Sequence, residues 1–266
     1  MEEYLAYYAA RYWAEHAKVV ELSQKAPTPV VVDFLSLQET VSLSYLYYAP
    51  DDDIHSPLGT TQRVESYPPA DPRRISALYY AACTGLVYSA MQMLRRGAAL
   101  NTSCGKLGTA LRAAALNGEM MLVEQLLEDG APIDAQFELF STALQAPAGL
   151  GDESMVRLLL ERGAAIDARS ELCGTALEVA SGEGRWANAR LLLEMGAEIG
   201  YALHAAARSG HRDIIRLLLD KGAKLDMRDD YRFTPLRWAE IKRQPMEILG
   251  LLGHQGVQKA TSLYNL

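Results

Sequence analysis

The chain has 266 residues, and its 26 Lys and Arg against 33 Asp and Glu give a formal net charge of −7. This acidic balance argues against a protein that coats nucleic-acid phosphates or grips an anionic membrane through a basic cluster. A mean hydropathy of −0.06 and short, charge-broken apolar runs predict a globular protein without a bilayer-spanning segment. The acidic start of the chain is unlike a signal peptide, so we expect a cytoplasmic protein.

The first 75 residues are more acidic than the rest, with 6 Lys and Arg against 11 Asp and Glu. Aromatic residues recur at three- and four-residue steps from Tyr4, which predicts a helix through about Glu21. A second apolar segment, 29–49, predicts another helix, and the prolines and aspartates of 49–72 predict a loop. We expect the two helices to cap the open end of the structure that follows.

From residue 76 onward the sequence repeats itself with a fixed step. Segments 108–134, 141–167 and 174–200 align without a gap, each at a step of 33 residues. The glycine after each apolar stripe keeps the same step, at Gly97, Gly130, Gly163 and Gly196. Because independent registers agree, the repetition is a property of the fold and not of composition.

Two further units complete the series. A unit at 201–226 arrives seven residues early, since Gly196 and Gly222 are 26 residues apart, and another follows at 233–256. In these units a Thr or Ser is suited to cap a short inner helix, and an apolar stripe is suited to form an outer helix. No single unit can bury its apolar face alone, so the units must stack.

This unit resembles the ankyrin repeat, whose signature T-P-L-H-x-A-A…G…LL..GA is nearly complete in 201–226. The resemblance covers about residues 76–258 and implies an all-α solenoid of about six helix-turn-helix repeats joined by hairpin fingers. The chain then divides into a helical cap with an acidic loop (1–75), a repeat array (76–258) and a tail (259–266). The resemblance also implies a protein partner, met by the finger tips and the concave face of the inner helices.

The string YYAARYWAEHA at 7–17 resembles the segment before the repeats in fungal NACHT–ankyrin receptor-like proteins. In those proteins the segment follows a nucleotide-binding domain. Here no G-x-x-x-x-G-K-[ST] loop occurs, so no NTPase function is implied. The resemblance predicts a fungal protein that descends from such a receptor tail or is a fragment of one.

Signatures of catalysis or metal binding are absent from the sequence. Cys83, Cys104 and Cys173 have no C-x-x-C spacing, so we expect no zinc, disulfide or cofactor. The histidines are dispersed, and His204 stands where the family ties a turn to the backbone. The cluster of Asp51–Asp53 with His55 is more typical of a solvated acidic loop than of a metal or base site.

Counting from the repeat register places the residues that we expect to meet a partner. They lie at finger tips or at exposed positions of inner helices, and small apolar groups beside charges suit such contacts. These candidates are Lys106, Leu116, Asn117, Glu138, Leu139, Arg169, Leu172, Arg208 and Tyr231.

Two departures from the repeat draw attention. The early arrival of Tyr201 leaves no room for a finger, which predicts a notch in the row of fingers. Pro147 lies inside a predicted helix, where a proline frees a carbonyl or bends the backbone.

Tyrosines are dense where the cap meets the first repeat, and they suggest an alternative. Tyr48, Tyr79, Tyr80 and Tyr201 are pocket candidates, since tyrosine combines an apolar face with a polar tip, although core packing explains them as well. A pocket of this kind could hold a small hydrophobic metabolite and promote a cofactor-free cyclisation, isomerisation or dehydration. Its acid–base groups would be Tyr79, Asp53, His55 and Arg112. The leading hypothesis remains a binding module without chemistry of its own.

Overall fold

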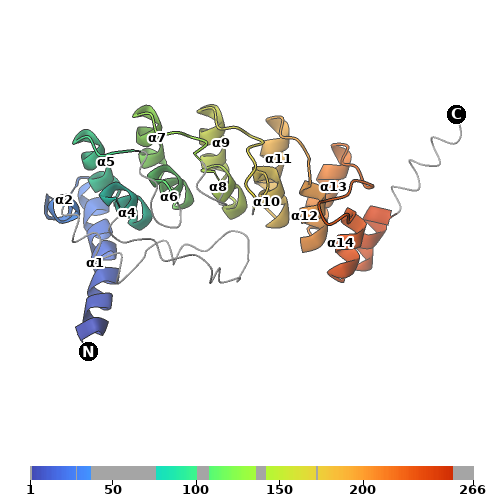
Figure 1. Cartoon of the computed structure of the whole chain (residues 1–266), viewed down its shortest axis with the longest axis horizontal. Coiled ribbons are helices and arrows are strands. Elements are labelled where there is room, and N and C mark those ends of the chain that lie inside the picture. The colour runs from blue at the N-terminus through green and yellow to red at the C-terminus, as the bar shows by residue number, and fades with distance from the viewer. Residues whose placement is uncertain are drawn as a thin grey trace, which may run out of the picture.

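A computed structural model describes residues 2–27, 29–36, 76–100, 108–135, 142–171 and 173–253, with the backbone alone for 2–11, 34 and 36. The described residues form a single row of two-helix units, with inner helices along one side and outer helices along the other (Figure 1). The only β pairing among them is an isolated bridge between Ser170 and Gly174. The all-α repeat solenoid expected from the sequence is confirmed.

The helices alternate along the row. Two precede the repeats, α1 (Glu2–Gln24) and α2 (Pro29–Ser36). The inner helices are α4 (Ala77–Thr84), α6 (Ala110–Leu116), α8 (Gln145–Leu150), α10 (Ala176–Gly182), α12 (Ala202–Ser209) and α14 (Pro235–Ile241). The outer helices are α5 (Val87–Arg95), α7 (Met120–Glu128), α9 (Glu153–Glu161), α11 (Trp186–Glu194) and α13 (Arg212–Asp220), and residues 246–253 are also helical.

The predicted caps begin most inner helices. Ser76, Thr109, Thr175 and Thr234 each accept a hydrogen bond from the backbone N–H three residues later. The recurrent glycine after each outer helix has a positive φ, from 84° at Gly97 to 96° at Gly196, which favours glycine strongly. The 33-residue step therefore marks a left-handed turn that each outer helix needs at its end.

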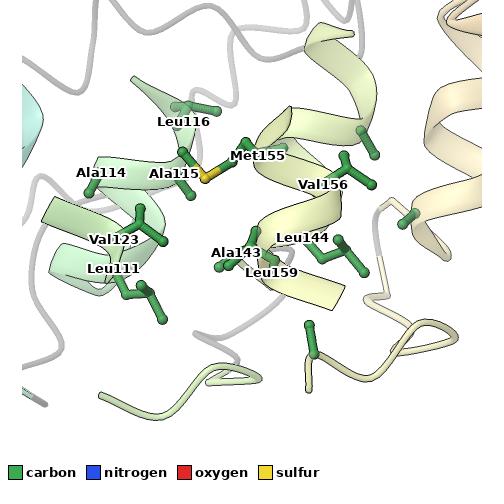
Figure 2. Close-up of a cluster of buried hydrophobic side chains, with 14 of the residues drawn as sticks. Leu111, Ala114, Ala115, Leu116, Val123, Ala143, Leu144, Met155, Val156 and Leu159 are labelled. Atoms are coloured by element: carbon green, nitrogen blue, oxygen red, sulfur yellow. The ribbon is translucent and has the colours of Figure 1, made fainter. Parts of the chain in front are cut away.

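Small and branched apolar side chains build one continuous core along the stack. The inner helices are rich in buried alanine, so that neighbouring inner helices pack closely against each other. Figure 2 shows the core between the second and third units, with Ala114, Val123, Leu144, Met155 and Leu159 among its members. Truncating one such buried Leu to Ala costs about 2–5 kcal/mol, because the stack cannot close the cavity.

The two N-terminal helices pack against α4 and α5, as expected for a cap (Figure 1). Glu21 is buried, and its carboxylate accepts hydrogen bonds from the backbone N–H and the hydroxyl of Ser89 on α5. Lys18 forms an ion pair of 2.8 Å with Glu119 in the next unit. The cap is thus held by specific polar contacts as well as by apolar burial.

Pro147 lies near the start of its helix. The repeat register predicts that α8 begins at Ala143, but it begins at Gln145, which places Pro147 in the first turn. Backbone N–H groups of a first turn have no partner within the helix, so the missing N–H of proline costs nothing there. The carbonyl of Pro147 itself accepts from the N–H of Gly151 at 3.0 Å.

The connector between α11 and α12 is short, as the sequence predicts. It spans residues 195–201, whereas the connector between α9 and α10 spans 162–175. Gly200 adopts a φ of 47°, and the N–H of Ala202 donates to the carbonyl of Ile199 to close the turn. The fifth unit therefore has no finger in front of it.

Candidate protein-binding surface

One position of each inner helix faces the finger that follows it, and we call it the finger-facing position. Gln145 and His204 occupy it in the third and fifth units, and both are buried. Gln145 donates from Nε2 to the carbonyls of Ala168 and Gly174, and His204 Nε2 lies 3.0 Å and 3.2 Å from the carbonyls of Met227 and Phe233. A donor at this position therefore fixes the next finger through its backbone.

The protonation of His204 follows from these contacts. Burial lowers the pKa of His204, while the carbonyls of Met227 and Phe233 and the charge of Asp229 oppose that shift. Two carbonyl acceptors near Nε2 require the tautomer with its proton on Nε2. The ring is thus a neutral donor, which supports the structural role expected from the sequence.

Glu178 occupies the same position in the fourth unit, where no finger follows. Its Oε1 accepts from Arg169 Nη1 at 2.7 Å and from the backbone N–H of Tyr201 at 3.4 Å. The guanidinium carbon of Arg169 also lies 5.2 Å from the centroid of the Tyr201 ring, within range of a cation–π contact. Arg169, a predicted partner contact, is half-exposed at a finger tip and is held in place by both neighbours.

A second group of aromatic side chains surrounds Trp238 at the C-terminal end of the row. Tyr231 and Phe233 meet the indole edge-on, with centroid distances of 6.0 Å and 5.4 Å. The indole Nε1–H donates to Asp229, whose other oxygen accepts from the N–H of Phe233. The guanidinium carbon of Arg208 lies 5.8 Å from the Trp238 centroid. We call Arg208, Trp238 and Tyr231 the aromatic corner.

Sequence reasoning selected Arg208 and Tyr231 but missed Trp238. The register places Trp238 at the position that Ala113, Ala146 and Ala205 occupy in other units. The first and fourth units have Tyr80 and Val179 at this position. A tryptophan where three of the other five units have alanine is a signal that could have identified it. Tyr231 is 73% exposed, so the corner presents a large aromatic ring to solvent.

Two other predicted contacts take different roles. Leu116 is 7% exposed and belongs to the core, so the expectation that it is exposed is wrong. Its burial comes from packing outside its own unit, which the repeat register does not report. Asn117 is exposed as expected, but its Nδ2 donates to the carbonyls of Ala82 and Cys83 at 2.9 Å and 2.8 Å, so it also joins two units.

Two of the four tyrosines of the proposed pocket, Tyr79 and Tyr80, are core residues. Tyr79 and Tyr80 are 0% exposed, and the Tyr80 ring stacks on Trp13 of the cap with 6.1 Å between centroids. Neither ring lines a space that water can enter, so the pocket prediction for these two is wrong. Tyr201 is half-buried and packs edge-on against His204 at 5.3 Å.

Of the four suggested acid–base groups, the structure describes Tyr79 and Arg112. Both are buried, and Arg112 lies near the ionisable groups of Cys173 and Tyr79. Burial lowers the pKa of Arg112, and these two groups oppose that shift. The remaining predicted residues lie outside the described part of the chain: Tyr48, Asp53, His55, Lys106, Glu138, Leu139 and Leu172.

The side chain of Cys83 is buried, and that of Cys173 is partly buried. Burial raises the pKa of the Cys173 thiol, against the opposing effects of Ser170 and Arg112, so the thiol is protonated at neutral pH. Neither Cys83 nor Cys173 is joined in a disulfide to a described residue. Within the described ranges, no three His, Cys, Asp or Glu side chains gather as metal ligands would.

The outer helices carry one shallow hollow of about 390 Å³ between α11 and α13. Trp186, Asp213, Arg216, Leu217 and Asp220 line it. The guanidinium of Arg190 lies 5.5 Å from the Trp186 ring and forms a 2.7 Å ion pair with Glu194. The lining of the hollow has two carboxylates, Asp213 and Asp220, and one cation, Arg216, which lies 3.9 Å from Glu247.

Comparison with known proteins identifies the repeats. A family model described as "Ankyrin repeats (3 copies)" matches residues 111–201 and 200–261, which together exceed half of the chain. No curated protein matches the sequence. The match leaves out the N-terminal segment, so the receptor-like resemblance of 7–17 stays a prediction. None of the helices in the described ranges is long and apolar enough to cross a membrane.

Proposed function

Since the chain belongs to the ankyrin-repeat family, whose members generally serve as protein–protein interaction modules, we propose that it binds one protein partner through its finger tips and concave face. The observation that carries the proposal is the exposure of Tyr231 beside a fixed Trp238. Rigid aromatic rings bury a large area at a small cost in conformational entropy, and interfaces are enriched in them. Arg169 and Arg208 are each held against an aromatic ring, Tyr201 and Trp238 respectively.

The stack supports this role because its surface is preorganised. Side chains from one unit donate to the backbone of the preceding unit at several points, including Asn188 to the carbonyls of Pro147 and Ala148. His211 and Gln244 make equivalent bonds to the carbonyls of Gly182 and Arg208. A surface that does not have to be ordered on association binds more tightly for the same contacts.

Catalysis is not part of this proposal. Tyr79 has no accessible surface and Arg112 is buried, so neither reaches a substrate without rearrangement of the core. No described residue favours the cyclase, isomerase or dehydratase alternative over binding.

Photo-crosslinking in cells tests the proposal. The variants Tyr231→p-benzoylphenylalanine and Trp186→p-benzoylphenylalanine place the same reactive group on the finger side and on the outer face, both at exposed aromatic residues. We expect one discrete covalent adduct from position 231 and none from 186. Equal labelling at both positions, or no adduct from 231 or from a second concave position such as Lys242, would contradict it.

A further inference from the structure

We propose that the aromatic corner binds an acidic segment of the partner, with a carboxylate on Arg208 and an apolar side chain against Tyr231. This inference rests on the proposed binding function and specifies the chemistry of what binds. It goes beyond the repeat fold, because the corner is built from residues at which the other units differ.

Arg208 differs from the other arginines that lie over aromatic rings in the described part of the chain. Arg169, over Tyr201, forms a 2.7 Å ion pair with Glu178, and Arg190, over Trp186, forms one of 2.7 Å with Glu194. Arg208, over Trp238, forms no ion pair with any described carboxylate, although Glu183 lies near enough to feel its charge. A guanidinium that contacts a ring and has no ion pair keeps N–H groups available for a bidentate bond to a carboxylate.

The neighbouring carboxylate does not fill this role. Asp229 accepts the indole Nε1–H of Trp238 through one oxygen and the N–H of Phe233 through the other. The Asp229 carboxylate therefore holds the indole and the backbone of the finger by hydrogen bonds, and it forms no ion pair with Arg208. An incoming carboxylate is the partner that the geometry leaves open.

Tyr231 supplies the apolar part of the corner. Its ring is 73% exposed and stands edge-on to Trp238, which Asp229 and Phe233 hold on the other side. A side chain of the partner that covers this ring excludes water from the indole and strengthens the adjacent ionic contact. A carboxylate and an apolar group close together in one segment therefore match the corner.

The charge of the C-terminal units favours an acidic partner. Residues 201–253 contain ten Lys and Arg against seven Asp and Glu, whereas the whole chain has a formal net charge of −7. Attraction to this part of the surface is expected to speed the encounter with a negatively charged segment and to weaken with salt.

The test uses the full chain and two labelled probes, a random Glu–Tyr copolymer and poly-glutamate. We expect the copolymer to bind more tightly than poly-glutamate at low ionic strength. Arg208→Glu should weaken copolymer binding about tenfold or more. Arg190→Glu is the matched control: it makes the same charge change at an arginine over a tryptophan, on the outer face, and should change binding less than about twofold.

A second variant separates the apolar contact from the charge. Tyr231→Ser removes an exposed ring, and we expect it to weaken copolymer binding about threefold to tenfold while leaving poly-glutamate binding unchanged. Circular dichroism of each variant establishes that it is folded.

The outcomes distinguish this inference from the proposed function. Failure of the wild-type chain to bind the copolymer, or equal losses for Arg208→Glu and Arg190→Glu, would overturn the acidic-segment proposal. If the adduct at position 231 forms and Arg208→Glu leaves its yield unchanged, the binding function stands and this inference is wrong. If the copolymer binds at the aromatic corner but no cellular adduct forms, the proposed function is wrong, and the inference that the corner binds acidic segments is retained.

Discussion

His204 gives the sharpest test of how the fingers are fixed. The side chain is 4% exposed, and its Nε2–H serves the carbonyls of Met227 and Phe233 at both ends of the finger that carries Tyr231. His204→Ala leaves these acceptors without that donor and opens a cavity where the ring was. We expect a loss of about 2–4 kcal/mol in the free energy of unfolding.

The third unit provides the matched control. Gln145 makes the equivalent bonds with an amide, so His204→Gln should retain the donor and cost less than about 1 kcal/mol at pH 8. The two residues then differ in their response to acid. Because the folded state lowers the pKa of His204, the unfolded chain binds more protons as the pH falls below about 6.5, and the wild type loses stability.

Glutamine does not titrate, so the stability of His204→Gln relative to wild type should increase as the pH decreases from 7 to 5. The difference can change by at most about 1.4 kcal/mol per pH unit, since one proton is involved. Urea unfolding between pH 5 and 8 measures it, and hydrogen exchange in residues 227–233 reports the finger directly. A glutamine variant as unstable as the alanine variant, or a difference independent of pH, would refute the reasoning.

Three further predictions concern the joints between units. Asn188→Ala should lower the free energy of unfolding by about 2 kcal/mol, because it removes the amide that donates to two carbonyls. Asn188→Asp should lower it by more, because a carboxylate would face these two carbonyls, and equal urea midpoints would contradict this. Glu21→Ala removes the carboxylate that binds Ser89, so α1 should lose hydrogen-exchange protection while α10 to α13 keep theirs, and a uniform loss would argue against a separable cap. Gly163→Ala meets no atom within 4 Å, so its cost should be the backbone strain alone, about 1–2 kcal/mol in thermal unfolding, and an unchanged melting temperature would show that the turn does not need glycine.

The architecture could be predicted because each unit carries residues that its own turns and helix ends require. The glycines at 97, 130, 163 and 196 are fixed by a positive φ at the end of an outer helix, and the Thr and Ser caps by the N–H groups of the first inner turn. Both constraints act within a few residues, so they leave a periodic trace in the sequence. The same logic placed the missing finger before Tyr201 correctly.

The candidate surface could be predicted only in part, because its contacts join different units. The pair of Arg208 with Trp238 crosses from α12 to α14, and no pattern within one unit contains it. Leu116 has the register of an exposed residue, and only its packing in the stack shows that it is buried. The surroundings of a side chain between two units depend on the particular residues of the neighbouring unit. The repeat pattern describes what the units share, so it does not predict contacts that depend on their differences.

The finger-facing position shows that such differences between units are not random. Where fourteen residues connect two units, the next finger offers backbone carbonyls, and the residue that faces them is a donor, as Gln145 and His204 are. Where the connector shrinks to seven residues, it offers the N–H of Tyr201, and the residue is the acceptor Glu178. A carboxylate in front of a full finger would face its carbonyls, so the loss of the finger and the change from donor to acceptor are compatible only together. The Glu178 carboxylate instead forms an ion pair with Arg169. Among the described arginines that contact an aromatic ring, Arg208 is then the one without an ion pair.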